Sequence, residues 1–169
     1  MDALTCLMTR RSIRKYAPGD VSEDLLEKLL RAAMSAPSAG NAQPWHFVAI
    51  RDRAALDEID NFHPYAKMVR EVPLAVLVCA EPAREKHKGF WVQDCSAATM
   101  NLLLAAHALG LGSVWVGIYP EQDRMDGFRR LLGLPGDIVP FALAPVGHPA
   151  QKAGEADRFA ADRVRVDRW

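Results

Sequence analysis

The sequence contains little cysteine and no hydrophobic run long enough to cross a membrane. The three cysteines, Cys6, Cys79 and Cys95, are widely spaced among apolar neighbours, and their odd number excludes a complete disulfide framework. We therefore expect buried, reduced thiols in a reducing compartment. The first residues also lack the apolar core and cleavage site of a signal peptide. These absences predict a cytoplasmic protein without a membrane partner.

Neither sign of charge predominates, since 21 basic residues balance 21 acidic ones and the formal net charge is zero. A chain with this balance offers no basic field for nucleic acid, so we expect no nucleic-acid partner. Half of the 169 residues are hydrophobic and a quarter are charged, which allows a substantial core. The length and the absence of a linker or repeat predict one domain spanning residues 1–169.

Motifs for metal binding and for nucleophilic catalysis are also missing. The histidines show no HxxxH pair and no two cysteines have the spacing of metal ligands, so we expect no metal. No serine or cysteine lies in an elbow-like motif. Gly110-Leu111-Gly112 follows a helical pattern and precedes a strand, which is typical of a helix C-cap and not of a dinucleotide-binding turn.

Apolar periodicity predicts a mixed α+β chain. Ser22 is a good N-cap for a helix with one apolar face, and this helix should stop before Pro37. Leu74–Ala80 is apolar throughout, which is typical of a strand buried on both faces. The remaining helices are predicted over residues 2–10, 52–71 with a break at Pro64, 90–109 and 121–132, and the remaining strands over 45–50, 113–119 and 141–146.

The helix predicted over residues 90–109 is apolar on every side, and at about 1.5 Å per residue it spans roughly 30 Å. Such a helix is buried all round, which a chain this small achieves with difficulty unaided. The charged tail, residues 150–169, ends in Val164, Val166 and Trp169. Alternate apolar residues in such a tail predict an added strand, with Trp169 as an anchor on another surface. Both features indicate a second subunit.

Two polar segments are candidates for ligand binding. Residues 10–14, Arg-Arg-Ser-Ile-Arg, place three guanidinium groups and a hydroxyl close together, and paired guanidinium donors fit phosphate well. The loop from Pro37 to Pro44 combines small residues, which let the backbone approach a flat ligand, with the amides of Asn41 and Gln43. Taken alone, each segment is as readily explained by a solvated basic patch or an ordinary amide-rich turn.

The order of these segments along the chain is more informative than either segment alone. RRSIRKY is followed by a helix, then by APSAGNAQPWHF, WVQDCSAATMNLLLAAHALGLGSVWVG and PVGHP. This series resembles the nitroreductase family of flavoproteins, and the resemblance runs from Met8 to Trp169. It implies an α+β fold with a central, mainly antiparallel sheet flanked by helices. It also implies an intertwined homodimer in which residues 150–169 wrap around the partner.

The resemblance further implies that FMN is the cofactor and lies between two subunits. Its ribityl chain and phosphate would be held by Arg10, Arg11, Ser12 and Arg14. Its ring would be lined from the other subunit by Pro37, Ser38, Ala39 and Asn41, with Gln43 nearby, and also by Val116 and Gly117. A tail arginine, Arg158 in preference to Arg163, would reach the phosphate. Asp94 and Asn101 match recurrent positions, where they would either anchor helix and loop or contact the ligand.

By the same resemblance, the protein is an NAD(P)H-dependent nitroreductase or flavin oxidoreductase. Hydride would pass from NAD(P)H through flavin N5 to a nitroaromatic, quinone or similar flat acceptor by a ping-pong mechanism, without a catalytic side chain. The alternatives are a flavin-binding redox module without turnover, and a relative with other flavin chemistry such as reductive dehalogenation or flavin cleavage. The stretches 51–73 and after Tyr119 are short, so we expect little lid and an open ring face.

Overall fold

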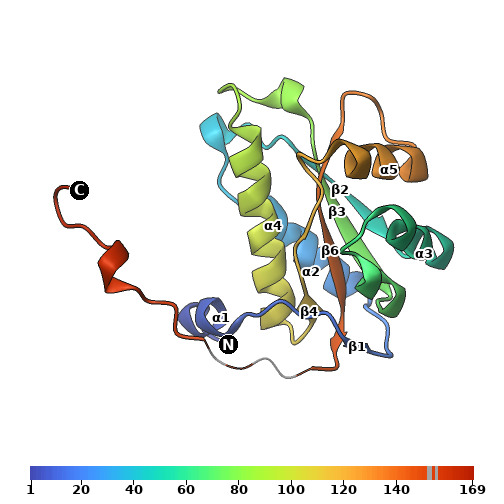
Figure 1. The fold of residues 1–169 in the computed structure, drawn as a ribbon, viewed down its shortest axis with the longest axis horizontal. Helices are drawn as coiled ribbons and strands as arrows, with labels where there is room; N and C mark the ends of the chain where they lie inside the picture. The colour runs from blue at the N-terminus through green and yellow to red at the C-terminus, as the bar shows by residue number, and fades with distance from the viewer. Residues whose placement is uncertain (152–153, 155) are drawn as a thin grey trace.

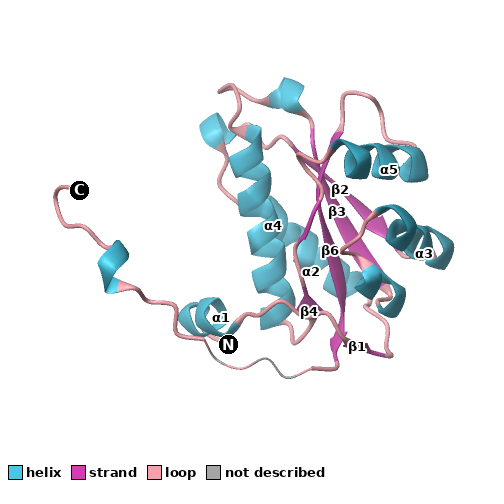
Figure 2. Ribbon diagram, viewed as in Figure 1, coloured by secondary structure: helices cyan, strands magenta, loops and turns pink. Residues whose placement is uncertain are grey.

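The computed structural model describes residues 1–151, 154 and 156–169, and a six-stranded sheet with purely antiparallel pairing organises them. Helices cover the sheet on both faces (Figures 1 and 2). The helices are α1 (Ala3–Thr9), α2 (Glu23–Met34), α3 (Arg53–Phe62), α4 (Trp91–Ala108) and α5 (Gln122–Leu132). The strands are β1 (Tyr16–Ala17), β2 (Trp45–Ile50), β3 (Leu74–Ala80), β4 (Gly112–Ser113), β5 (Val116–Gly117) and β6 (Val139–Pro149). The predicted α+β class with a central antiparallel sheet is confirmed.

Strands β3 and β6 form the centre of the sheet, in the order β1-β6-β3-β2, and β4 and β5 also pair with β6. Every residue of β3 is buried. Leu77 and its alternate neighbours belong to the core beneath α3 and α5, whereas Val76 and its alternate neighbours belong to the cores beneath α2 and α4. Because both faces of β3 are covered, the strand is apolar throughout, as its sequence predicts.

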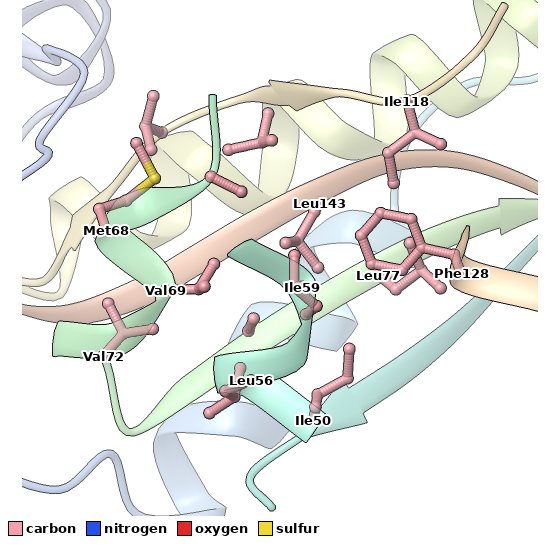
Figure 3. Close-up of a cluster of buried hydrophobic side chains, with 14 of the residues drawn as sticks. Ile50, Leu56, Ile59, Met68, Val69, Val72, Leu77, Ile118, Phe128 and Leu143 are labelled. Carbon is pink, nitrogen blue, oxygen red and sulfur yellow. The ribbon is translucent and has the colours of Figure 1, made fainter. Parts of the chain in front are cut away.

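Figure 3 shows the core between the sheet and helices α3 and α5. Leu56, Ile59 and Phe128 are fully buried there against Leu77. The helix-like stretch 52–71 is interrupted where the sequence predicts, because α3 ends at Phe62 and a 3-10 helix, η2 (Lys67–Glu71), follows Pro64. This arrangement places residues 63–68 beside β5.

The second layer consists of α2 and α4, and the local signals read from the sequence explain its geometry. The Ser22 hydroxyl accepts a hydrogen bond from the Leu25 N–H, as an N-cap does, and α2 ends at Met34, before Pro37. Helix α4 buries Cys95, Ala98, Leu102 and Ala106 against the sheet. The described part of the chain contains no helix long and apolar enough to cross a membrane.

The prediction of one continuous strand over residues 113–119 is wrong. The structure contains two short strands, β4 and β5, which pair with β6 in the same register, Ser113 opposite Val146 and Val116 opposite Leu143. That register places Val114 opposite Pro145. Proline has no N–H to donate, so the ladder of hydrogen bonds is interrupted at this point.

The long central helix is not buried all round within a single chain, so its complete burial stays a prediction that requires a second subunit. The outward face of α4 is partly exposed, with Met100 at 40% exposure. Helix α1 packs beside this face, at the α4 end where Thr9 meets His107, and it leaves Leu4 and Met8 exposed as well. The exposed apolar side chains of α1 and α4 together form a surface that a second subunit could cover.

The tail runs away from the body of the chain, as Figure 1 shows. A 3-10 helix, η4 (Ala161–Arg163), is its one regular element within residues 156–169, and no strand is present among those described residues. Trp169 is fully exposed, and its ring lies beneath the Arg165 guanidinium at 5.3 Å. Strand formation by the tail therefore stays a prediction that requires a second chain.

Candidate functional site

The N-terminal basic segment is fixed in part by its backbone. Helix α1 ends at Thr9, and the chain continues in an extended conformation through Arg10 to β1. The buried Ile13 donates its N–H to the Ser113 carbonyl at 3.0 Å and so joins this segment to β4. Gly112 permits the close approach, since a Cβ there would lie 2.8 Å from the Ile13 side chain. Arg10 and Ser12 are half-buried and Arg14 is exposed.

Arg10 and Arg158 lie near each other although they are far apart in the sequence. Burial lowers the pKa of Arg10, and the positive charges of Arg158 and Arg11 lower it further. Cations that repel one another in this way gain stability from an anion bound between them. The structure thus brings the preferred tail arginine to the predicted phosphate-binding segment, and it does so within one chain.

Arg11 has a different set of contacts from its neighbours. Its guanidinium donates hydrogen bonds to the carbonyls of Met8, Arg10 and Gly154 at 2.8, 2.7 and 3.0 Å. These contacts tie the segment to the start of the tail. They occupy the guanidinium donors, so Arg11 holds the segment in place, and its predicted contact with a ligand stays untested.

A cavity of about 500 Å³ opens beside this segment. Its lining comes from three parts of the chain, namely Arg14, the η2 region with Pro64, Tyr65, Lys67 and Met68, and the β4–β5 segment Val114, Trp115, Val116 and Gly117. The cavity therefore joins three of the predicted site residues, Arg14, Val116 and Gly117. Lys67 was not predicted, because a single lysine after a helix break has no distinctive sequence signal.

Gly117 forms part of the cavity wall and is held from behind by two side chains. His63 Nε2 and Arg124 Nη1 both donate to the Gly117 carbonyl, at 2.8 and 2.9 Å. His63 Nδ1 accepts a hydrogen bond from the Tyr65 N–H at 3.3 Å, so the proton of the neutral ring lies on Nε2. Burial lowers the pKa of His63, and the Arg124 charge lowers it further, which favours this neutral form.

The amide-bearing loop, residues 37–43, adopts an unusual backbone. Gly40, Asn41 and Gln43 have φ values of 59°, 54° and 49°, in the left-handed region that few side chains adopt without strain. Internal hydrogen bonds support the loop, because the Ser38 hydroxyl accepts from the Gln43 N–H and the side-chain Oδ1 of Asn41 accepts from Gln43 Nε2. The loop therefore has a defined shape that presents backbone and amide groups.

Asp94 and Asn101 anchor this part of the molecule to helix α4. The buried Asp94 carboxylate accepts the Ala39 N–H at 2.9 Å, and its second oxygen has no partner among the described residues. Asn101 Nδ2 donates to the Ala32 carbonyl, in the last turn of α2, at 3.0 Å. Of the two roles predicted for these residues, the structure supports the anchoring of helix and loop.

The two predicted halves of the site do not meet within one chain. The loop residues Pro37, Ser38 and Ala39 line a separate hollow on helix α4 and the residue before it, with Phe90, Gln93, Asp94 and Ala97. Asp94 lies near the start of α4, whereas His107, near its end, contacts the Thr9 hydroxyl at 2.8 Å. A helix rises about 1.5 Å per residue, so these contacts are roughly 20 Å apart (Figure 1).

The sequence model described as the nitroreductase family matches residues 7–82 and 63–148. The chain belongs to the nitroreductase family. A protein of Methanothermobacter thermautotrophicus named "Putative NADH dehydrogenase/NAD(P)H nitroreductase" is 50% identical over 169 residues, which cover 100% of this chain and 88% of the relative. Other members of this nitroreductase family are named as oxidoreductases as well, and the chain is accordingly an oxidoreductase by family.

Solved structures agree with this assignment. A crystal structure from Bacteroides thetaiotaomicron VPI-5482 that bears the same name has a TM-score of 0.95 and 39% identity, over 99% of this chain and 98% of that one. A structure described as a "putative nitroreductase in complex with fmn" from Desulfovibrio desulfuricans has a TM-score of 0.85 and 32% identity, over 98% of this chain and 96% of that one. The nitroreductase fold implied by the resemblance is confirmed over nearly the whole chain.

Proposed function

We propose that this nitroreductase is an FMN-dependent NAD(P)H oxidoreductase whose flavin lies between two subunits. The observation that carries the proposal is the cavity beside Arg14, Lys67 and Gly117, which has cations at its edge and a glycine in its wall. The relative of known structure that binds FMN shares the fold over nearly the whole chain. The cofactor therefore has both a suitable cavity and a precedent.

The residues of the cavity fit FMN in size and in charge. Its volume of about 500 Å³ lies within the usual range for small-molecule sites, which is about 300–1,000 Å³. Trp115, Val116 and Met68 supply apolar contacts for a flat ring, and the space beside Gly117 is open. Arg10, Ser12 and Arg158 would hold the phosphate, with Arg14 at the ribityl chain.

The second subunit would complete the site. Each chain presents its loop of residues 37–43 at one end of α4 and its arginines at the other, so a second copy in antiparallel orientation would bring one loop to the partner's cavity. The exposed apolar surface of α1 and α4 would be the interface. The tail, with Trp169 fully exposed, would then wrap around the partner. We therefore propose a homodimer.

When bound, FMN supplies the redox chemistry that the side chains lack, which is acceptance of a hydride from NAD(P)H and its later delivery to a second substrate in a ping-pong cycle. The cavity lining contains no carboxylate, so its side chains bind and orient. Lys67 lines the cavity and would stabilise negative charge at the N1–C2 edge of the bound ring. The backbone of residues 38–41 would orient the reacting edge from the partner subunit.

The acceptor follows from the openness of the site. The connections on either side of the cavity are short, because α3 and η2 fill residues 53–71 and α5 follows β5 directly. No lid element contacts the cavity in the described residues, so the exposed ring would accept flat oxidised compounds such as nitroaromatics and quinones.

The buried free cysteines, with burial raising the pKa of Cys79 and Cys95 to about 12, suit the reducing cytoplasm, where we place the protein.

Spectroscopy of the purified protein tests the proposal. We expect a yellow dimer in sedimentation analysis, bleaching of the flavin band by NADH or NADPH without oxygen, and recovery of the band on addition of a nitroaromatic or quinone. Flavin that nicotinamides do not reduce would indicate a binding module without turnover. Reduction without recovery by such acceptors would point to other flavin chemistry. A colourless, folded monomer that does not take up FMN would contradict the proposal as a whole.

A further inference from the structure

The segment between β3 and α4 carries a cluster of cations next to the amide-bearing loop. Residues 84–88, Arg-Glu-Lys-His-Lys, are exposed except for Glu85, which is half-buried. Lys86 Nζ donates to the Gly40 carbonyl at 2.7 Å. The side chains of Lys86 and His87 pack on the loop so closely that a Cβ at Gly40 would lie 3.1 and 3.3 Å from them. The cations are therefore attached to the loop itself.

Two exposed or half-buried carboxylates near this cluster, Glu81 and Glu85, are already engaged. Glu81 is paired with His46 at 2.7 Å and with Arg84 at 3.5 Å. Glu85 accepts the Gly89 N–H at 2.8 Å. Among the residues that the structure describes, Lys88 has no carboxylate partner, and the Lys86 ammonium contacts only a neutral carbonyl. The positive charge of these two lysines is thus available to an anion from solution.

The position of the cluster relative to the loop suggests which anion it meets. Figure 1 shows η1 (Ala39–Asn41) and the segment before α4 at the same end of that helix. Between them, Phe90 is 44% exposed and lines the hollow formed with Pro37, Ser38 and Ala39. A ligand stacked on a ring beside this loop would extend over an aromatic side chain toward the ammonium groups of Lys86 and Lys88, neither of which is paired with a carboxylate among the described residues.

We propose that Lys86 and Lys88 form the docking surface for the phosphates of the reduced nicotinamide dinucleotide. The inference rests on the proposed function, because it takes the loop to lie against the flavin ring of the partner subunit. The nicotinamide must stack on that ring, and the pyrophosphate must then lie on the protein surface nearby. The sequence has no dinucleotide-binding turn, so surface cations are the groups left to recognise the phosphates. A 2′-phosphate adds negative charge, which makes NADPH the preferred donor.

Charge reversal at Lys88 tests this surface, since Lys88 contributes no described contact to the loop. In anaerobic flavin reduction, Lys88→Glu should raise the apparent Kd for NADPH about three- to tenfold at low ionic strength. The increase should be smaller for NADH, and it should shrink at about 0.15 M salt because screening shortens the range of the interaction. Lys86→Glu/Lys88→Glu should show a larger change of the same kind.

Two controls separate docking from damage. The first is 1-benzyl-1,4-dihydronicotinamide, a hydride donor without phosphates, whose reaction Lys88→Glu should leave unchanged. The second is Arg130→Glu on α5, which reverses an exposed charge outside the site. This variant should change neither the apparent Kd for NADPH nor the reaction with the uncharged donor. An unchanged Kd for NADPH, or an equal loss with the uncharged donor, would overturn the docking surface alone. A wild-type protein that binds no FMN, or whose flavin no donor reduces, would overturn the proposed function with it.

Discussion

The two halves of the proposed flavin site are built in different ways. The half around Arg14 and Lys67 rests on regular structure, because β5 pairs with β6 and the Gly117 carbonyl is held by His63 and Arg124. The half at residues 37–43 is a loop with three residues in the left-handed conformation. Its Ala39 N–H donates a hydrogen bond to the buried carboxylate of Asp94. The first half is held by regular structure, whereas the loop half is held by its own hydrogen bonds, by the surface contact from Lys86 and by one buried anchor, Asp94.

The halves also differ in what they offer a ligand. The first half gathers cations, with Arg10 and Arg158 close enough to lower the pKa of Arg10. The loop offers chiefly neutral groups, namely backbone amides and the side chains of Asn41 and Gln43. We infer that the first half provides most of the binding free energy for FMN, whereas the loop provides shape and orientation. Mutations in the two halves should therefore differ in size and in kind.

The largest effect is expected in the cationic half. Arg10→Ala/Arg14→Ala removes two charge-assisted contacts of about 1.5–3 kcal/mol each, so the Kd for FMN should rise about 10²- to 10⁴-fold. The flavin content after purification and a fluorescence titration of the apoprotein measure the change. Lys28→Ala/Arg130→Ala removes the same charge from exposed positions outside the site and should retain its flavin. Equal flavin content in both double variants would remove the phosphate assignment.

Local signals in the sequence predicted the framework of the first half well. The apolar run of β3 indicated a strand covered on both faces, and the cap at Ser22 and the prolines fixed the ends of α2 and α3. The family resemblance then assigned the arginines to the FMN phosphate, and that assignment stays a prediction. The division of 113–119 into two strands was missed, because it depends on Pro145, which lies in a different strand.

The supporting contacts of the site could not be predicted for the same reason. His63 is a single histidine in a polar stretch, and its partner carbonyl at Gly117 is distant in sequence, so no spacing reveals the pair. Lys67 likewise lines the cavity only because η2 packs beside β5, which the sequence alone does not reveal. Pairings that cross between layers of the fold depend on tertiary packing, whereas caps, breaks and buried strands depend on neighbouring residues.

An intermediate effect is expected in the loop half. Asp94→Ala leaves the Ala39 N–H without its acceptor, which costs about 1–3 kcal/mol, so the Kd for FMN should rise about five- to 150-fold. Asp94→Asn keeps an oxygen that can accept this hydrogen bond and should lose less. Thermal unfolding and flavin titration of both variants measure the change. If Asp94→Ala bound FMN as tightly as the wild type, the loop would not depend on this anchor.

The smallest effect is a pH dependence of stability that His63 contributes to the first half. Burial, and then the Arg124 charge, lower the pKa of His63 below its unfolded value of 6.5. Below about pH 6.5 the unfolded chain therefore takes up a proton that the folded chain does not, and the free energy of unfolding should fall as the pH falls, until the lowered pKa is reached. Above pH 6.5 this contribution should be constant.

Urea unfolding at a series of pH values around and below 6.5 measures this slope. His63→Gln can still donate to the Gly117 carbonyl but has no proton to gain, so its slope should be shallower than that of the wild type. His107 provides the matched control, because burial lowers its pKa as well. His107→Gln should retain the part of the slope that His63 contributes. If His63→Gln showed the full wild-type slope, another group would titrate in its place, and the wall of the cavity would not depend on the neutral ring.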